Sequence, residues 1–100
     1  MMSFTEKIYN KLKEVPKGKV ITYKRLAELV NSKAYRAVGT AMRNNKDPIN
    51  IPCYKVICSD GSVGNYSASG GIKKKIKLLR EDGIEVKNNK VDLKKYYFKE

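Results

Sequence analysis

The stretch Ile51-Pro52-Cys53-Tyr54-Lys55-Val56-Ile57 lies in the middle of the chain and separates two halves of different character. Pro52 lacks a backbone N–H and has a fixed φ, so a strand is predicted to begin here, with Cys53 as the first residue past the proline. The apolar run that follows is typical of a buried strand. A cysteine at such an edge can be a nucleophile where its thiolate is favoured, or simply a small buried hydrophobic residue.

Length and charge narrow the class of protein. One hundred residues suit one domain, residues 1–100, with a modest core, and a composition of 41% hydrophobic and 32% charged residues is ordinary for a globular protein. Lysine and arginine number 22 against 10 acidic residues, which gives a formal net charge of +12. So basic a small domain is typical of proteins that bind nucleic acid. The alternative is a lysine-rich surface that serves solubility, as in some thermophile proteins.

Other features disfavour several classes of protein. No apolar run is as long as a membrane span and no signal peptide precedes the first predicted helix, so we expect an intracellular protein of the cytoplasm, nucleoid or nucleus. The two cysteines lie five residues apart on one predicted strand, where they are poorly placed to pair. The chain has no histidine, which removes the usual general base and most zinc sites. We expect a monomer with neither metal nor cofactor.

Three helices are predicted before the central stretch. Ser3 with Glu6 forms a capping box for the first helix, whose apolar residues recur at helical spacing. Thr22 is placed to cap a second helix, and Ser32 to cap a third over residues 33–44. Two short helices joined by a tight turn predict a helix-turn-helix motif.

The third predicted helix is rich in small residues. Glycine lowers helix stability, so Gly39 requires a physical reason. One reason is close packing between helices, and the other is close approach of a nucleic-acid backbone. The residue by itself favours packing. The small residues are Ala34, Ala37, Gly39 and Ala41.

The second half predicts short strands and one further helix. Residues 59–62 form a hairpin-type turn leading to Val63, and a hairpin after a helix-turn-helix is typical of a winged helix. Residues 84–86 and 91–93 predict a second small hairpin. We therefore expect a small, helix-rich α+β domain, winged-helix-like, with short strands. Residues 72–80 predict an amphipathic helix that buries Ile72, Ile76 and Leu79 and leaves Lys73, Lys74, Lys75 and Lys77 in solvent.

Several separate motifs resemble the O6-alkylguanine-DNA alkyltransferases, also called methylated-DNA–protein-cysteine methyltransferases. The central stretch, followed by Gly64-Asn65-Tyr66-Ser67, looks like that family's active-site signature. Arg36-Ala37-Val38-Gly39 and Ala41-Met42-Arg43-Asn44-Asn45 resemble its recognition helix. The resemblance runs in order from about Phe4 to about Val86. It corresponds to the family's C-terminal DNA-binding and active-site domain, and the family's usual N-terminal domain would be absent.

The resemblance implies DNA repair by direct alkyl transfer. Cys53 would take the alkyl group from guanine O6 in duplex DNA, once per protein molecule, after the base is flipped out through the minor groove. Tyr23 would press on the target's 3′ phosphate and donate a proton to the leaving base. Asn45 would link the recognition helix to the active-site strand. The implied catalytic residues are Cys53, Tyr54, Asp82, Tyr23 and Asn45.

The resemblance also implies how DNA is held. Arg36 would enter the base stack and fill the gap, although by itself it could equally contact a phosphate, as Tyr23 could be a core aromatic. The implied DNA-binding residues are Arg36, Tyr23, Lys33, Ala34, Ala37, Gly39 and Arg43. The implied walls of the base pocket are Tyr66, Ser67, Met42, Val56 and Val63.

The sequence departs from the family pattern in several places. Tyr54 stands where the family has histidine, so the relay from cysteine through water and histidine to a carboxylate lacks its middle member. Asp82 stands where the family has glutamate. We expect Tyr54 to order a water or to donate a hydrogen bond to Asp82 rather than to remove the thiol proton. Tyr35 occupies a small-residue position, and Ala68-Ser69 resembles an insertion in the pocket loop.

Two other functions remain open at this point. An alkyltransferase-like sensor would bind damaged guanine without repairing it. Such proteins typically carry tryptophan in place of the cysteine, so Cys53 argues against this class while Tyr54 keeps it open. A winged-helix transcription factor would need no cysteine pocket and would prefer a sequence to a lesion.

Overall fold

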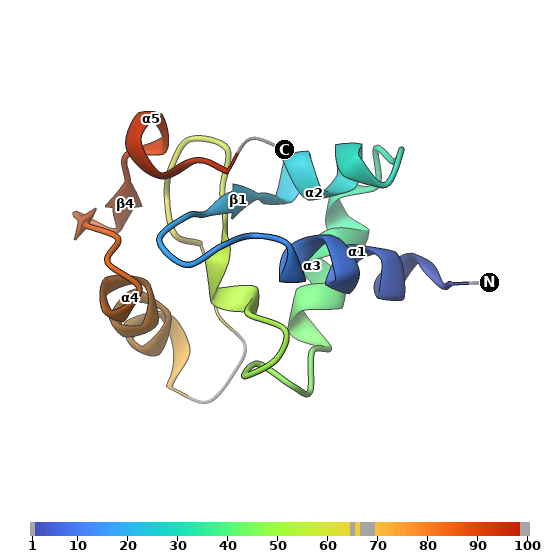
Figure 1. The fold of residues 1–100 in the computed structure, drawn as a ribbon, viewed down its shortest axis with the longest axis horizontal. Coiled ribbons are helices and arrows are strands. Elements are labelled where there is room, and N and C mark those ends of the chain that lie inside the picture. Colours follow the sequence, from blue (N-terminus) through green and yellow to red (C-terminus); the bar gives the residue numbers. More distant parts are fainter. Residues whose placement is uncertain (1, 65, 67–69, 99–100) are drawn as a thin grey trace.

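The computed structural model describes residues 2–64, 66 and 70–98. Its short central strands lie between an N-terminal half made mainly of helices and a C-terminal half that contains both helices and strands (Figure 1). No helix in these ranges is long and apolar enough to cross a membrane. The elements are α1 (Phe4–Lys13), β1 (Ile21–Thr22), α2 (Tyr23–Leu29), α3 (Tyr35–Arg43), the 3-10 helix η1 (Cys53–Lys55), β2 (Val56–Ile57), α4 (Gly71–Glu81), β3 (Val86–Lys87), β4 (Lys90–Val91) and α5 (Leu93–Tyr96).

The first two helices begin where their capping residues predict. The Ser3 hydroxyl accepts a hydrogen bond from the Glu6 backbone N–H at 3.1 Å. The Thr22 hydroxyl accepts one from the Arg25 N–H, also at 3.1 Å. Each cap satisfies a backbone donor that has no partner inside the helix.

The third helix begins at Tyr35, so its predicted start at residue 33 is wrong. The Ser32 hydroxyl accepts from the Ala34 N–H at 2.9 Å and closes a local turn in place of a helix cap. Lys33 and Ala34 therefore lie in the turn before α3. Helices α1, α2 and α3 pack against one another, which confirms the helix-turn-helix.

The strand pairing differs from the predicted hairpin around residues 59–62. The turn is present, because the Cys58 N–H donates to the Ser62 carbonyl at 2.9 Å. Its far side, Val63, belongs to no strand, and β2 pairs instead in parallel with β1, with Val56 opposite Ile21. Pairing with β1 is non-local, and the turn signal alone could not reveal it.

The second predicted hairpin is confirmed as β3–β4. Asn88 and Asn89 connect its strands with φ of 52° and 60°. Two consecutive positive φ values define the type I′ turn that suits the twist of a two-residue hairpin, and asparagine tolerates them.

The tail after β4 closes the domain. After α5 it runs beside β1, where the Val20 N–H donates to the Tyr96 carbonyl at 2.9 Å and the Phe98 N–H donates to the Val20 carbonyl at 2.8 Å. The N-terminal and C-terminal parts of the domain are thereby tied together (Figure 1).

Two hydrophobic clusters form the core, and β2 lies between them. Val56 is fully buried in the cluster of α1, α2 and α3, while Ile57 is fully buried in the cluster of α4 and the β3–β4 hairpin. Successive strand residues point to opposite faces, so two adjacent residues can each enter a different cluster. The segment that carries Cys53 is thus fixed from both sides.

Helix α4 does not place its lysines as predicted. Lys73, Lys74 and Lys77 are exposed, but Lys75 is completely buried, and Ile72, predicted to be buried, is 39% exposed. The Lys75 ammonium donates to the carbonyls of Val56 and Val63, which offer acceptors inside the domain. These two bonds offset part of the cost of burying a charge.

Candidate active site and recognition helix

A pocket of about 340 Å³ opens next to Cys53. It gathers residues from α2, α3, η1 and the segment after β2, which are far apart in the sequence. Among residues predicted to line a base pocket, Met42 and Tyr66 do so, whereas Val56 and Val63 are fully buried in the two clusters behind it. Ser67 lies outside the described residues. The lining consists of Tyr23, Tyr35, Gly39, Met42, Arg43, Cys53, Cys58, Gly64 and Tyr66.

Cys53 starts a 3-10 turn, so the prediction that a strand begins at this residue is wrong. Pro52 has φ −77° and ψ 70°, values typical of an inverse γ-turn, and the Cys53 N–H donates back to the Ile51 carbonyl at 2.7 Å. The strand begins only at Val56. The tight turn leaves the Cys53 side chain 6% exposed beside the pocket. Both Cys53 and Cys58 are free thiols.

Asn45 connects the end of α3 to this turn. Its side-chain N–H donates to the Ile51 carbonyl at 2.8 Å, and its side-chain oxygen accepts from the Asp47 N–H at 2.9 Å. One amide therefore fixes the chain between α3 and Cys53 at both ends. Asn45 thus connects the end of α3 to the turn that carries Cys53, and its role in the reaction stays a prediction.

Tyr66 lines the same pocket as the Cys53 thiol. Burial, together with the charge of Cys53 and a hydrogen bond to it, raises the pKa of Tyr66 to about 12. The phenol therefore stays protonated at neutral pH and can donate to sulfur.

Tyr23, the first residue of α2, lies on the other side of the pocket. Burial first, then the charges of Cys58 and Cys53, raises the pKa of Tyr23 to about 12, so it too is a neutral donor. Gly64 has φ +71°, and a Cβ there would lie 3.2 Å from the Cys58 sulfur and 3.9 Å from the Tyr23 hydroxyl. Glycine lets the chain approach both groups in a backbone conformation that other residues rarely adopt.

Lys75 is the buried cation of the site. Its Nζ lies 5.9 Å from the centroid of the Tyr23 ring. Burial lowers the pKa of Lys75 to about 8, and the charges of Cys58 and Cys53 act in the opposite direction. Lys75 is therefore a positive charge within electrostatic reach of both thiols. Its helical spacing, three residues after Ile72 and four before Leu79, was the sequence signal that could have identified it.

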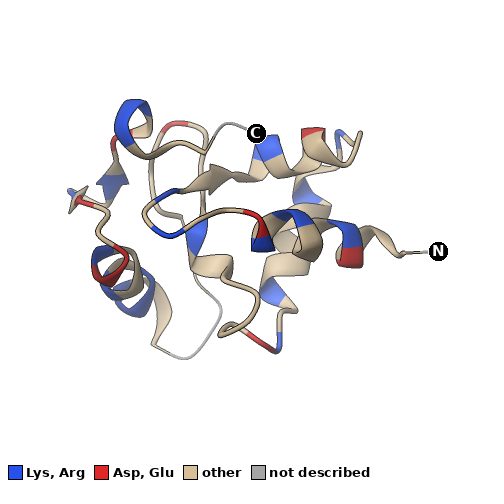
Figure 2. Cartoon of the chain, in the orientation of Figure 1, with Lys and Arg blue, Asp and Glu red and all other residues tan. Residues whose placement is uncertain are grey.

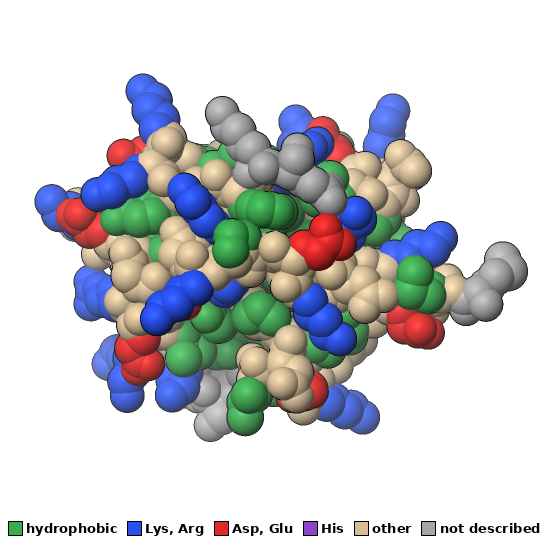
Figure 3. Space-filling view, viewed as in Figure 1, with side chains coloured by type: hydrophobic (Ala, Val, Ile, Leu, Met, Phe, Trp, Pro, Cys, Tyr) green, Lys and Arg blue, Asp and Glu red, His purple; other side chains and the backbone are tan. Residues whose placement is uncertain are grey.

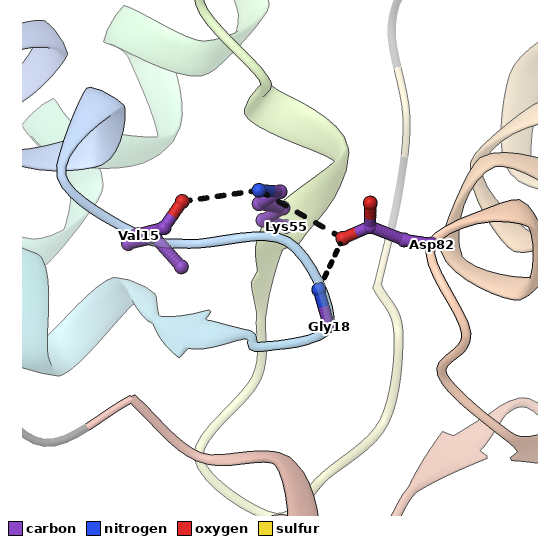
Figure 4. A network of polar contacts seen from close by, with 4 residues as sticks. All are labelled: Val15, Gly18, Lys55 and Asp82. Carbon is purple, nitrogen blue, oxygen red and sulfur yellow. Dashed lines mark hydrogen bonds and ion pairs between the residues drawn. The ribbon is translucent and has the colours of Figure 1, made fainter.

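Asp82, at the end of α4, is not among the residues that line the pocket and is anchored by Gly18 and Lys55 (Figure 4). Its carboxylate accepts from the Gly18 N–H at 2.9 Å and lies 3.8 Å from the Lys55 ammonium. Lys55 also donates to the Val15 carbonyl at 3.0 Å, and its side chain is 8% exposed. The carboxylate thus ties α4 to the loop between α1 and β1.

Tyr54, which follows Cys53 in the chain, interacts electrostatically with Asp82. Burial, then the charge of Asp82 and a hydrogen bond to it, with a further contribution from Glu81, raises the pKa of Tyr54 to about 12. Donation of a hydrogen bond from Tyr54 to Asp82 stays a prediction. A phenol with so high a pKa is a poor proton acceptor at neutral pH.

The outer face of helix α3, next to the pocket, is exposed to solvent. Val38, Ala41 and Met42 are buried, while Arg36 and Arg43 are exposed two turns apart. A Cβ at Gly39 would meet nothing within 4 Å, so the prediction that helix packing explains this glycine is wrong. Ala37 is partly buried and Gly39 lines the pocket. Close approach of a partner from outside the protein stays a prediction for this glycine.

A protein-family model described as "6-O-methylguanine DNA methyltransferase, DNA binding domain" matches residues 3–84. The chain belongs to this family. The human methylated-DNA–protein-cysteine methyltransferase is 54% identical over 83 residues, which cover 81% of this chain and 39% of that protein. A bifunctional methyltransferase/endonuclease of Picrophilus torridus is 52% identical over 92 residues, 91% of this chain and 30% of the relative. The chain spans about a third of these relatives.

Solved structures of the family share the fold. Atl1 of S. pombe, in complex with damaged DNA containing O6-carboxymethylguanine, matches with a TM-score of 0.88 and 30% identity over all of both chains. The O6-methylguanine-DNA methyltransferase of Pyrococcus kodakaraensis matches with a TM-score of 0.74 and 44% identity, covering 84% of this chain and 48% of that one.

Three residues of the site were missed by sequence analysis. Lys75 and Lys55 were hidden among many lysines, most of which are solvated. Tyr9 of α1 donates to the Ala41 carbonyl of α3 at 2.6 Å, and burial followed by the charge of Cys53 raises its pKa. Tyr9 lies one position beyond Ile8 in the apolar repeat of α1, so its spacing carried no distinct signal.

Replacing Asp82 with alanine is expected to lower the free energy of unfolding by about 2 kcal/mol, because the buried Lys55 ammonium loses its counter-ion and the Gly18 N–H loses its acceptor. Urea unfolding measures the change. Glu85→Ala removes a carboxylate from an exposed ion pair with Lys87 and serves as the control. Equal effects of the two substitutions would contradict the anchoring role of Asp82.

Proposed function

We propose that this chain repairs DNA by moving an alkyl group from guanine O6 to the sulfur of Cys53. The observation that carries the proposal is the position of this thiol, beside a pocket whose walls include α3 and the hydroxyl-bearing ring of Tyr66. Family membership supports the same reaction. A winged-helix transcription factor would have no need of such a thiol pocket.

The proposed step is a direct displacement that needs no external reductant or oxidant. The Cys53 thiolate attacks the alkyl carbon in line, a carbon–sulfur bond forms and the carbon–O6 bond breaks. The bond pair leaves with guanine, and a proton from the neutral Tyr23 hydroxyl compensates the charge. The proton that the Cys53 thiol released replaces the one that Tyr23 donated, so no net proton is gained or lost. Because the thioether is stable, each molecule acts once.

The target base must leave the duplex stack to reach the pocket. Arg36 is exposed on α3 and is proposed to occupy the gap that the base leaves. Ala37 and Gly39 would allow the helix to approach the minor groove, consistent with the open space at Gly39. Lys33, Ala34 and Arg43, at the two ends of α3, are proposed to contact the DNA backbone. The partner is therefore double-stranded DNA with an alkylated guanine.

The proposal extends to the organisation of the chain. Residues 1–100 are proposed to act as one monomeric, intracellular domain that corresponds to the family's C-terminal DNA-binding and active-site domain. The pocket and α3 lie within the stretch that the family model matches, which supports this correspondence.

Mass spectrometry of the intact protein after mixing with a duplex that contains O6-methylguanine tests the proposal. One added methyl group per molecule is expected, and peptide mapping should place it on Cys53. Turnover beyond one equivalent, or no adduct at all, would overturn the proposal.

The sensor function is the second candidate, and two observations favour it. The fold matches the whole of Atl1, bound in that structure to damaged DNA, and the family histidine is replaced by Tyr54. A sensor would bind the methylated duplex tightly and leave no mass change on the protein. Measuring binding and adduct formation on one sample separates the two functions.

Replacing Arg36 with alanine is expected to slow repair in duplex DNA by about 10-fold or more, because the extruded state loses the side chain that fills the stack. Reaction with free O6-benzylguanine base should change little, since no base has to be extruded. Single-turnover kinetics on both substrates measure this. Lys13→Ala on α1 is the control for charge. Equal losses on both substrates would contradict the proposed role.

Replacing Tyr54 with phenylalanine is expected to change the repair rate at pH 7 by less than about 3-fold, because a phenol with a pKa near 12 removes no proton there. Tyr54→His should raise that rate, since neutral imidazole can accept a proton near neutrality. Single-turnover rates from about pH 6 to pH 8, a window around the reference histidine value, measure both. A large loss in Tyr54→Phe would show that the phenol takes part directly.

A further inference from the structure

A second concave surface lies between α4 and the β3–β4 hairpin. It encloses about 620 Å³ and shares no residue with the pocket at Cys53. Helix α4 lies at one end of the molecule, and α3 lies in the other half (Figure 1). This groove, called the α4 groove below, is lined by Lys73, Ile76, Lys77, Arg80, Glu81 and Asn89.

The α4 groove carries uncompensated positive charge. Lys73 and Lys77 are one helical turn apart, about 6 Å along the axis, and both are exposed. Within the described residues neither forms an ion pair or a hydrogen bond through its side chain. Three cations face a single carboxylate in the lining, that of Glu81. Figure 2 shows the basic residues of α4, and Figure 3 shows that lysine and arginine side chains project around the whole outline of the molecule.

The α4 groove is also preformed. The Arg80 guanidinium donates to the Val86 carbonyl at 2.9 Å and so bridges α4 and the hairpin. The Asn89 carbonyl accepts from the Val63 N–H at 2.9 Å, which fixes the hairpin turn on the opposite wall. Ile76 is half-buried against the second cluster and supplies an apolar floor. An apolar centre with a polar rim is the usual anatomy of a protein-recognition site.

We propose that the α4 groove binds an acidic peptide segment of a partner protein. One apolar side chain of the segment lies on Ile76, and flanking carboxylates pair with Lys73, Lys77 and Arg80. The volume suits a few side chains. A duplex backbone fits less well, because its phosphates gain nothing from the apolar floor at Ile76. Because α3 is not part of the α4 groove, the protein can bind the partner and damaged DNA at the same time.

Fluorescence anisotropy with the full chain tests this inference. The probe is a fluorescein-labelled twelve-residue peptide of glutamate and aspartate with one central phenylalanine. Lys73→Glu combined with Lys77→Glu is expected to weaken binding by about 10-fold or more, because two attractive charges become repulsive. The matched control is Lys7→Glu combined with Lys13→Glu on α1, which makes the same charge change on exposed lysines and should weaken binding by less than about 3-fold.

Two further measurements make each outcome decisive. A peptide with alanine in place of phenylalanine should bind at least about 3-fold more weakly, because it leaves Ile76 uncovered. An undamaged duplex should not displace the peptide. Equal losses in the two charge-reversal variants, indifference to the phenylalanine, absence of binding, or displacement by duplex would each overturn the inference, the last by assigning the groove to DNA. Thermal unfolding of every variant confirms that it is folded.

Discussion

Replacing Cys53 with serine is expected to abolish methyl transfer to the protein, whereas Cys58→Ser should still acquire one methyl group. Both thiols are free and both line the pocket, so accessibility alone does not separate them. Two features favour Cys53. It lies at the turn that Asn45 fixes to α3, and its charge raises the pKa of Tyr66, which lines the same pocket. A serine hydroxyl is far less readily ionised than a thiol and cannot substitute as the nucleophile.

The environment of Cys58 suits a structural thiol. Its sulfur lies against Gly64, where even one added carbon would be only 3.2 Å away. Intact-protein mass spectrometry after a single turnover measures the result in both variants, and binding to the methylated duplex shows that each is folded. A methyl group on Cys58, or retained transfer in Cys53→Ser, would contradict the assignment of the nucleophile.

Replacing Lys75 with methionine is expected to change both stability and repair. Burial lowers the pKa of this lysine from 10.5 to about 8, so the unfolded chain binds more protons than the folded one between these values. Stability that depends on Lys75 is therefore reduced below pH 8 and recovered as pH rises toward 10.5. Relative to Lys75→Met, the wild type should gain about 3 kcal/mol across this window, at about 1.4 kcal/mol per pKa unit.

Urea unfolding of the wild type and of Lys75→Met at pH 7 and at pH 10 measures this gain in the free energy of unfolding. All other titrating groups are present in both proteins, so their effects cancel in the difference. Lys74→Met, an exposed neighbour, should keep a constant difference from the wild type. This pH dependence of stability has the opposite sign to that of a tyrosine with a raised pKa, whose contribution to the free energy of unfolding falls as pH rises above 10. A difference between wild type and Lys75→Met that does not change with pH would show that the lysine is solvated.

The same substitution should slow methyl transfer at pH 7, because it removes a buried positive charge that interacts with both thiols and lies beside the Tyr23 ring. The loss should be as large with free O6-benzylguanine as with duplex, which separates Lys75 from Arg36. Equal rates for wild type and Lys75→Met would contradict a role of this cation in the transfer.

Local sequence determined much of this protein. Ser3 and Thr22 start their helices because a hydroxyl on the capping residue satisfies nearby donors, a property of a few consecutive residues. The turn at Asn88 and Asn89 follows from their tolerance of positive φ. The motifs around Cys53 and in α3 identified the family, which the comparisons confirmed.

The tertiary structure alone decided how these parts act together. A strand was predicted at Cys53 from Pro52, but the anchoring of Ile51 by Asn45 accompanies a tight turn. Lys75 is buried because free carbonyls of two distant segments surround it, and no count of lysines in α4 distinguishes it from its solvated neighbours. Burial and pairing of charge depend on non-local contacts, whereas caps and turns depend on adjacent residues.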